Sequence, residues 1–524
     1  MPNELQLRPE AHQAAEAERA ASRTAALSIN DLDRSEFRNI PVRQEVASTS
    51  TSLPRLELVE GANEPSRVAE TPERSLRRQV SESYSTPELR ARGERFSRDM
   101  DLFTERARAS GMSEREVSET FRQVSRILDA GSDARLPHSD RLALASQVMH
   151  NAAHPTEIRQ NENTCNVTSL EVRTYMRQPS AAAALVADVA TRGSFSGHDG
   201  TTVRLDNRSL TPSVLGTTEL EQEPSRRNFA SQLFQVTAAN IANILDPDFR
   251  SMRYEQRPPR SVGDFGEALV DVRTGHVVER EPGAAGRPNG LIAANESITG
   301  RRDEADAFIV NQERYGRTAS RAATFTSADD LGQTLERLAS SGRMPAVVFV
   351  HANSELLTQP TRGETRPADR ETLRQRAEVP ANIFNDGHFV TITGYDPITR
   401  TVRYDDQYGP ESDRNDRPVS LDTFYRATNV VRANELIDRL VSARGHMSQA
   451  EFARNLTRLT RIYAERWQLV ESAGGTALSP EVRADRDSAT RRISVLSQGL
   501  TPRQRQVVEA SMRSRTAIGT RQEH

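Results

Sequence analysis

Two neighbouring segments near residue 400 alternate apolar and polar positions, and this pattern predicts a β-hairpin. Val390 and Ile392 stand two positions apart in the first segment, and Val402 and Tyr404 do so in the second. Between the segments, residues 396–399 are Asp-Pro-Ile-Thr. Because proline has the fixed φ that suits the second position of a tight turn, this tetrapeptide is predicted to reverse the chain.

Apolar residues at helical spacing predict most of the other elements. Helices are predicted near residue 100 and at 114–128, 142–153, 181–190, 227–245, 327–339 and 420–427. A continuous apolar run at 345–350 predicts a buried strand, and 201–205 predicts a shorter one. After about residue 434 the spacing is helical again, so we predict a helical C-terminal region at 431–524.

The first 92 residues differ from the rest of the chain in composition. They are rich in Ser, Thr, Pro, Glu and Arg and mostly lack apolar periodicity, apart from one predicted helix at 9–26. Such a segment buries too little apolar surface to fold, so 1–92 is predicted to be a disordered leader. The other predicted divisions are a helical subdomain at 93–155, a central α+β domain at 156–430 with an insertion at about 193–325, and the C-terminal region.

The composition of the whole chain narrows the classes of protein that fit. Of the 524 residues, 35% are apolar and 5% aromatic, low values that agree with a disordered portion. The net charge of −3 argues against a general nucleic-acid-binding protein and against a protein of the membrane surface. No apolar run approaches the length of a membrane span, and the N-terminus lacks the apolar region of a secretory signal. We therefore expect a cytoplasmic protein, or one exported without a signal peptide, with neither nucleic acid nor membrane as partner.

The chain contains no lysine, so all 70 of its basic residues are arginine. A coding bias toward GC-rich codons is the simpler explanation of this composition. Lysine is also the residue to which ubiquitin is attached. A protein that acts in a ubiquitin-containing host cytosol could therefore profit from having none, which is the basis of a further hypothesis that the chain is an injected effector or toxin.

Cys165 is the single cysteine of the chain, so an intramolecular disulfide is impossible. Polar residues precede it at 159–164, and apolar residues such as Val167 and Leu170 follow it at roughly helical spacing. Cys165 is therefore predicted to lie at a helix N-terminus, where the helix dipole and unpaired N–H groups favour a thiolate. The alternative is an inert buried thiol, which is the usual state of a lone cysteine.

The predicted hairpin has a histidine where its first strand begins and carboxylates where its second strand ends. His388 lies on the apolar face of the first strand, and Asp406 lies on the apolar face of the second. If both faces pack on one core, His388 and Asp406 come together, while Asp405 points away. An imidazole beside an orienting carboxylate forms two thirds of a catalytic triad, which Cys165 could complete.

These residues occur in an order that resembles the papain-like cysteine peptidases, most closely their C39-like bacterial branch. The matching motifs are Gln160 before Cys165-Asn166-Val167-Thr168-Ser169-Leu170, Leu335-Glu336-Arg337-Leu338 before Pro345-Ala346-Val347-Val348, Gly387-His388, Gly394-Tyr395-Asp396, Asp406-Gln407-Tyr408-Gly409, and Ser420-Leu421-Asp422-Thr423-Phe424. They cover about 155–176 and 328–428. Three features depart from the family pattern. Asn166 stands where the family usually has glycine, the long separation of the cysteine from the histidine requires an insertion, and Gln160 is one residue closer to the cysteine than is usual.

The resemblance implies a papain-like α+β fold, in which an N-terminal helix carries the cysteine and an antiparallel sheet carries the histidine and the aspartate. In that fold Cys165 would be the nucleophile and His388 the general base and acid. Asp406 would orient the imidazole of His388. Gln160 would donate to the oxyanion, with the asparagines at 161 and 163 as alternatives because the spacing to the cysteine is one residue shorter than usual.

The implied chemistry is thiol-dependent acyl transfer, with a cysteine peptidase that cleaves protein or peptide substrates as the default outcome. The same constellation serves glutamine deamidases and transglutaminases, and the sequence does not separate these outcomes. A non-enzymatic interaction protein built on a papain-like scaffold is a further alternative. No cofactor and no metal is expected, and the oligomeric state is not predicted.

Other histidines give weaker signals. His150 and His154 could place two imidazoles on one helix face, as zinc sites do. The sequence identifies no third ligand, and Pro155 ends the helix there, so both are predicted to be surface histidines. His351 follows a predicted buried strand and could replace His388 as the base, but it lacks the trailing strand and carboxylate.

Overall fold

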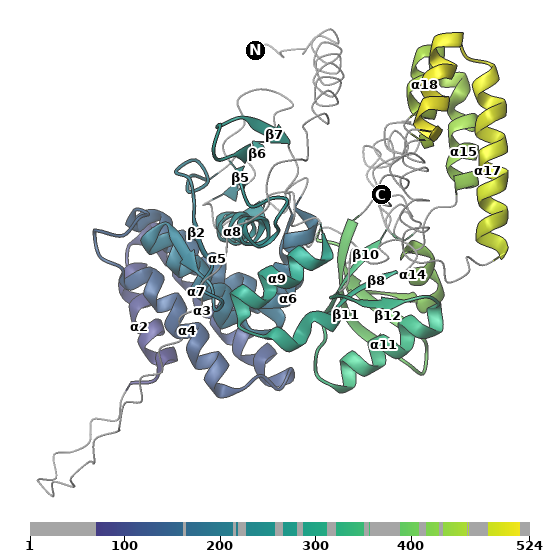
Figure 1. The fold of residues 1–524 in the computed structure, drawn as a ribbon. Coiled ribbons are helices and arrows are strands. Elements are labelled where there is room, and N and C mark those ends of the chain that lie inside the picture. The colour runs from purple at the N-terminus through teal and green to yellow at the C-terminus, as the bar shows by residue number, and fades with distance from the viewer. Residues whose placement is uncertain are drawn as a thin grey trace, which may run out of the picture.

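The computed structural model describes residues 70–160, 164–212, 216–217, 227–256, 266–279, 287–311, 321–350, 356, 388–407, 416–428, 433–457, 459–460 and 480–513. A group of helices lies beside a six-stranded sheet, as Figure 1 shows. This combination confirms the predicted α+β class. The helix predicted at 9–26 lies outside the described residues. None of the described helices has the length and apolar character needed to cross a membrane.

The described chain begins with the helices α2 (Pro72–Ser83), α3 (Pro87–Ala109), α4 (Glu114–Asp129) and α5 (His138–Ala153). Thr71 and Ser113 cap α2 and α4, because their side chains accept a backbone N–H from the first turn. Leu76 and Val80 of α2 are buried. The predicted end of the leader at residue 92 is therefore corrected, since the polar residues that suggested disorder lie on the outer faces of an amphipathic helix.

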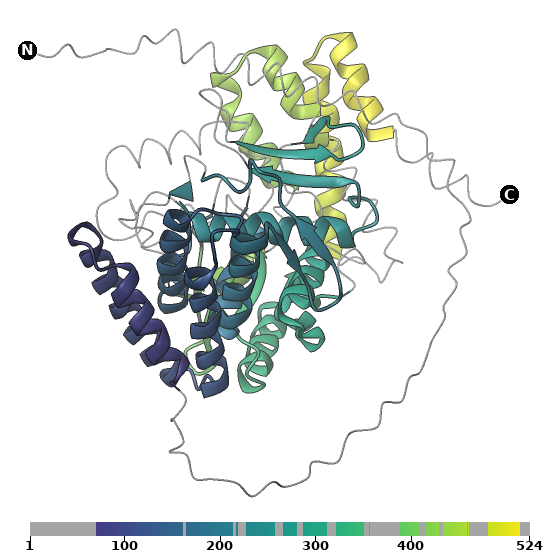
Figure 2. The same ribbon diagram turned by 90° about the vertical axis from the view of Figure 1, so that its left-hand side faces the viewer.

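A second group of helices packs on the first, and the two groups run alongside one another in Figure 2. It contains α6 (Cys165–Arg177), α7 (Pro179–Arg192), α8 (Phe229–Leu245) and α9 (Pro288–Thr299), with the 3-10 turns η2 (Pro155–Glu157) and η4 (Arg302–Ala307). The short strands around it are β1 (Ser194–Ser196), β2 (Thr202–Arg204), β3 (Gly216–Thr217), β4 (Arg227–Asn228), β5 (Met252–Gln256), β6 (Glu267–Asp271) and β7 (Val277–Glu279).

Side chains from α2 through α9 form one continuous apolar core. The predicted helical subdomain at 93–155 is therefore not separate from the predicted domain at 156–430. The predicted insertion at 193–325 is also part of this core, because it supplies α9 and α8, and α8 is buried along almost its whole length.

The six-stranded sheet has the order β13-β12-β11-β10-β8-β9. Its strands are β8 (Phe308–Asn311), β9 (Ala323–Phe325), β10 (Ala346–Val350), β11 (His388–Asp396), β12 (Thr401–Asp405) and β13 (Arg417–Ser420). The strands from β10 to β13 pair antiparallel, whereas β8 pairs parallel with both β10 and β9. The expected antiparallel sheet is therefore found around the hairpin only. In the rest of the sheet, α11 (Ala328–Ser340) is a crossover connection from β9 to β10, which run in the same direction on either side of β8.

The two faces of the sheet pack on different partners. The alternating apolar residues that predicted the hairpin pack with α11 and α14 (Leu421–Thr428). They are Val390, Ile392, Val402 and Tyr404. Phe389 points to the opposite face and joins the helical core, and Thr391 on that face donates to the carbonyl of Ser169 in α6 at 3.4 Å. The hairpin thus lies between α6 and the outer helices.

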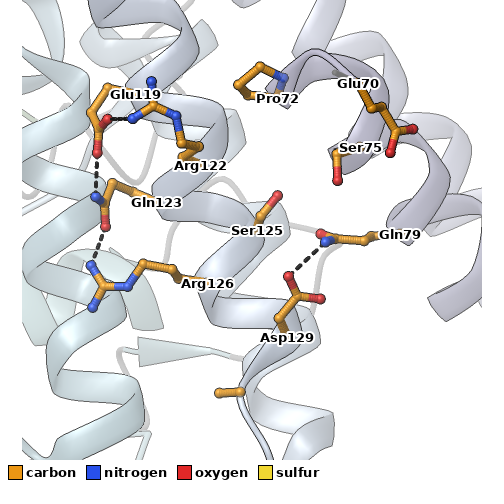
Figure 3. Close-up of a pocket in the computed structure, with 11 residues that line it drawn as sticks. Glu70, Pro72, Ser75, Gln79, Glu119, Arg122, Gln123, Ser125, Arg126 and Asp129 are labelled. Carbon is orange, nitrogen blue, oxygen red and sulfur yellow. Dashed lines mark hydrogen bonds and ion pairs between the residues drawn. The ribbon is translucent and has the colours of Figure 1, made fainter. Parts of the chain in front are cut away.

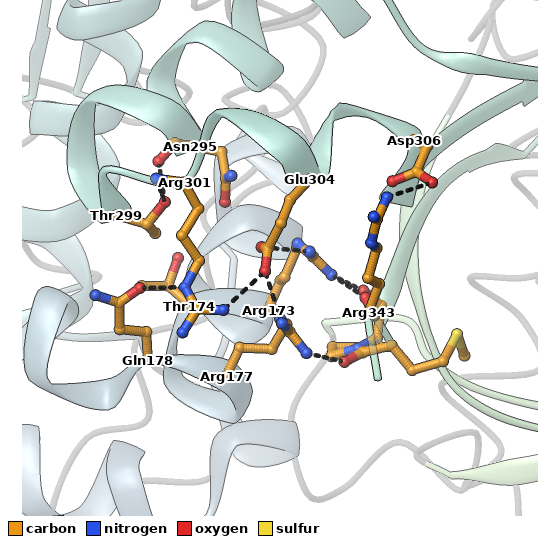
Figure 4. Close-up of polar contacts among 12 residues, drawn as sticks. Arg173, Thr174, Arg177, Gln178, Asn295, Thr299, Arg301, Glu304, Asp306 and Arg343 are labelled. Atoms are coloured by element: carbon orange, nitrogen blue, oxygen red, sulfur yellow. Dashed lines mark hydrogen bonds and ion pairs between the residues drawn. The ribbon is translucent and has the colours of Figure 1, made fainter. Parts of the chain in front are cut away.

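A cluster of arginines around Glu304 ties α6 to the sheet (Figure 4). Glu304 accepts from Arg173 at 2.7 Å and from Arg177 at 2.6 Å. Both arginines also donate to backbone carbonyls of 342–345, the segment that leads into β10. The side chains of Arg173 and Glu304 are only 1% and 4% exposed. The C-terminal end of α6 is therefore fixed to the strand that neighbours β11.

The described C-terminal region is helical, as the apolar spacing predicts. Its elements are α15 (Ala433–Ser442), η7 (Ala443–His446), α17 (Pro480–Gln498) and α18 (Pro502–Arg513). Buried residues such as Leu440, Leu456 and Ile493 form an apolar cluster of their own. This part of the chain therefore has a small core distinct from the one that holds α6.

Candidate active site

Cys165 is the first residue of α6, as the sequence predicts, and its side chain is half-buried. The first turn of a helix leaves backbone N–H groups without intrahelical partners, and the helix dipole is positive there. α6 packs against β11, the strand that begins at His388. The structure therefore brings the single thiol to the start of the predicted hairpin.

His388 lies between the thiol and the end of β12. Its ring Nε2 donates to the backbone carbonyl of Asp406 at 2.8 Å. A carbonyl oxygen can only accept, so this bond fixes a proton on Nε2. Nδ1 is then the nitrogen available to Cys165, whose side chain hydrogen-bonds the ring.

The two groups shift each other's protonation in opposite directions. Burial alone would raise the pKa of Cys165, but His388 and the backbone N–H groups of Phe389 and Asn166 outweigh it and lower that pKa. Burial alone would lower the pKa of His388, but the charge and hydrogen bond of Cys165, followed by contributions from Asp406, raise it. Both shifts favour a thiolate–imidazolium pair, the reactive state of a cysteine nucleophile.

Asp406 acts on His388 through its main chain as well as its charge. Its carbonyl accepts the Nε2–H, and its negative charge also raises the pKa of His388. The predicted partner is therefore present at the site. Part of the orienting role belongs to a backbone oxygen, which no side-chain pattern could reveal.

Asp405 lies on the other face of β12, as strand parity predicts, where it pairs with Thr391. Its Oδ1 accepts the N–H of Gln407 at 3.0 Å, whereas its Oδ2 is buried and meets no hydrogen-bond partner in the part of the chain that the structure describes. Burial, with the nearby charge of Asp406, raises the pKa of Asp405 well above its usual range. These conditions favour the neutral acid, which is unsuited to stabilising an imidazolium.

Gln160 is tied to the same end of β12. Its backbone N–H donates to the carbonyl of Gln407 at 3.1 Å, and Gln407 directly follows Asp406. Gln407 has a φ of 56°, a left-handed conformation that turns the chain away from the strand direction. Gln160 Oε1 is buried and has no hydrogen-bond partner among the described residues. The structure thus brings Gln160 beside the other predicted residues, and its role toward an oxyanion stays a prediction. The asparagines at 161 and 163 lie outside the described residues.

A buried polar network beneath the start of α6 gave no clear signal in the sequence. At its centre Gln235 of α8 accepts from Thr164 Oγ1 at 2.9 Å and from Arg227 at 2.7 Å. The Nε2 of Gln235 donates to the Arg159 carbonyl at 3.0 Å and to Glu171 Oε2 at 2.9 Å. These bonds support both sides of the segment that leads into α6. Polar residues within the apolar helix α8 were the one available hint.

His150 and His154 are partly buried, not freely exposed, since their side chains are 20% and 29% exposed and face the carboxylates of Asp99 and Glu157. That prediction is corrected, because α3 and η2 cover this end of α5. His351, the alternative base, lies outside the described residues.

A groove between α2 and α4 is less suited to catalysis (Figure 3). Several of its polar side chains bond one another, as Gln79 does with Asp129 at 2.7 Å and Arg122 with Glu119. None of the described residues that line it is a cysteine or a histidine. We therefore place the candidate site at Cys165 and His388.

Comparison of the chain with models of protein families, with curated proteins and with solved structures found no match. The chemistry of this site must accordingly be inferred from its own residues.

Proposed function

We propose that the chain is a thiol acyl-transfer enzyme of the papain-like kind, with cleavage of protein or peptide substrates as its most direct activity. The contact between Cys165 and His388 carries this proposal. It joins a thiol at a helix N-terminus to an imidazole whose far nitrogen is held by the Asp406 carbonyl. A structural thiol would not need a lowered pKa or an oriented base.

In the proposed reaction the Cys165 thiolate attacks the substrate's carbonyl carbon. The imidazolium of His388 then gives its proton to the leaving amine, and a thioester remains on the sulfur. Water, deprotonated by the now neutral His388, attacks the thioester and releases the carboxylic acid. The thiolate–imidazolium pair is thereby restored.

Two donors are proposed for the oxyanion that forms during attack. The backbone N–H of Cys165 lies at the open end of α6, and the second proposed donor is the carboxamide of Gln160, a residue whose backbone N–H bonds the Gln407 carbonyl just after β12. Loss of one such donor typically lowers turnover by about 100-fold. We therefore expect Gln160→Ala to lower the rate of acyl transfer while leaving alkylation of the thiol nearly unchanged.

Alkylation of Cys165 by iodoacetamide tests the central contact directly, since the chain has no other thiol. The lowered pKa of Cys165 predicts faster alkylation at pH 7 than that of a simple thiol, and a weaker dependence of that rate on pH. His388→Ala should restore the steep pH dependence of an ordinary thiol. Asp406→Ala should have a smaller effect, because the carbonyl that holds Nε2 survives the substitution. A wild-type rate equal to that of a simple thiol at every pH would sink the proposal.

Mass spectrometry of a candidate target protein identifies the kind of acyl transfer. Hydrolysis breaks the backbone, deamidation changes a glutamine to glutamate, and transglutamination forms a cross-link. All three products should disappear with Cys165→Ala. A binding activity that persists in Cys165→Ala, with no such product in the wild type, would instead favour an interaction protein.

A further inference from the structure

Four side chains from three elements converge at the C-terminal end of α5, on the chain leading to Gln160. His150 and His154 lie one helical turn apart on α5 and its cap, so their rings are neighbours, with centroids 4.8 Å apart and planes tilted by 38°. Asp99 comes from α3, and Glu157 comes from η2. The sequence showed the histidines, but it could not show which carboxylates the fold would bring to them.

Asp99 is placed to bind a cation together with both histidines. Its Oδ2 lies 3.3 Å from His150 Nδ1, and its Oδ1 lies 3.6 Å from His154 Nε2. One ligand atom from each of these residues can be chosen so that all lie within 4.8 Å of one another. Zinc bonds to such atoms at about 2.1 Å, so its ligands in a tetrahedron are separated by about 3.4 Å. The observed separations need only a small closing movement.

Glu157 occupies the position that a supporting carboxylate takes around a metal-bound histidine. Its two oxygens lie 3.4 Å from His150 Nε2 and 3.6 Å from His154 Nδ1, the ring nitrogens that face away from Asp99. Ligating histidines typically donate their second ring N–H to such a carboxylate, which fixes the tautomer and the ring orientation. His150 Nε2 is buried and makes no hydrogen bond within the described residues.

We propose that Asp99, His150 and His154 form a binding site for a divalent transition-metal ion, with zinc as the best-suited ion and Glu157 as the carboxylate that orients the rings. Two imidazoles and a carboxylate suit zinc, which also accepts a water as its fourth ligand. Asp99 is the better ligand of the two acids, because its side chain is 7% exposed and that of Glu157 is 34% exposed. Bound metal would join α3, α5 and η2 and would fix the start of the segment that leads to Gln160.

The test uses the full-length chain with Cys165→Ala, which contains no thiol, so its result does not depend on the proposed catalytic site. Zn²⁺ titrated against a chromogenic chelator should show one tight site per chain and should raise the melting temperature. Asp99→Asn and His154→Ala should abolish this site. Glu157→Gln should weaken it by about 10- to 100-fold, the usual effect of losing a supporting carboxylate. His138→Ala is the matched control, because His138 lies on α5 but is exposed, and it should bind Zn²⁺ like the parent.

Two further measurements need no substitution in the cluster. Co²⁺ should give the visible absorption bands of a tetrahedral site, and Zn²⁺ should protect His150 and His154, but not His138, from diethylpyrocarbonate. Absence of a tight site in the parent chain would overturn the proposal and leave an ion-pair cluster without metal. Equal protection of all three histidines, or undiminished binding in folded Asp99→Asn, would overturn it as well.

Discussion

At the scale of single residues, the surroundings of Glu171 disfavour its ionised form. It lies on α6 within the polar network beneath Cys165, and it is fully buried. Burial raises the pKa of Glu171 to about 7, although Gln235, Ser231 and Arg227 act in the opposite direction. The network therefore accommodates the neutral acid better than the carboxylate.

This shift predicts how the stability of the protein depends on pH. The folded state holds the Glu171 proton more tightly than the unfolded chain, whose ordinary pKa is 4.5. The contribution of Glu171 to the free energy of unfolding is therefore greatest below pH 4.5. It falls by on the order of 3 kcal/mol as the pH rises to about 7. Glu171→Gln, a neutral side chain of the same shape, should flatten this part of the pH profile. Urea unfolding at pH 5 and pH 8, followed by circular dichroism, measures the difference.

Glu105 on α3 is the control for that experiment, because it is exposed. Glu105→Gln should leave the pH profile of unfolding unchanged. If Glu171→Gln and the parent lose the same stability between pH 5 and pH 8, Glu171 is not the titrating group.

Sequence patterns pointed to the residues that the structure brings together at the candidate site better than to the residues that surround them. Cys165 could be recognised as the single thiol, and His388 and Asp406 could be recognised from their places at the ends of the predicted hairpin strands. Each of these signals can be read from the sequence without knowledge of tertiary contacts. Gln235 and Glu171 could not be found in this way, since a polar residue in a helix is normally exposed. Their burial follows from the contact of α6 with α8, which is a tertiary relation.

At the scale of elements, the hairpin was predictable because a period of two distinguishes a strand without reference to its partners. The parallel strands β8 and β9 were not, because they are short and their pairing depends on the crossover helix α11. α2 was missed for a different reason. Only two of its residues, Leu76 and Val80, are buried, so its composition resembles that of a disordered segment.

The attachment of α6 to the sheet depends on Glu304. Glu304→Gln would leave Arg173 and Arg177 with a neutral partner in a site where the Arg173 side chain is 1% exposed. Removing one member of a buried ion pair typically costs about 3–5 kcal/mol. We expect a loss of that order in urea unfolding. Alkylation of Cys165 should also slow, because α6 would no longer be fixed against the strand next to β11.

Asp306 is the matched control, since it belongs to the same turn η4 and pairs with Arg337 and Arg343 near the surface. Asp306→Asn should cost less than Glu304→Gln, because its arginine partners are 55% and 34% exposed and solvent weakens these ion pairs. Similar losses for the two variants would show that the Glu304 cluster has no special role in fixing α6.

At the scale of the whole molecule, the core that surrounds the candidate site extends to α2. This helix lies within the segment that composition alone assigns to a leader, yet Leu76 is fully buried, and Tyr84 at its C-terminal cap donates to the carbonyl of Leu142 in α5 at 2.7 Å. α2 packs against α4 and α3, and burial of its leucine stabilises the fold in the same way wherever the residue falls in the sequence. A substitution in α2 should therefore lower the stability of the folded unit that contains the candidate site, although α2 is far from that site in the sequence.

Leu76→Ala tests whether α2 belongs to that unit. Truncation of a buried leucine removes its transfer free energy and leaves a cavity, which together cost about 2–5 kcal/mol. We expect a clear fall in the melting temperature, measured by calorimetry, in a transition that also exposes Cys165 to alkylation. Arg78→Ala on the same helix, where the side chain is 54% exposed, should have little effect. Were α2 part of a leader, neither substitution would change the transition, and the core would begin at α3.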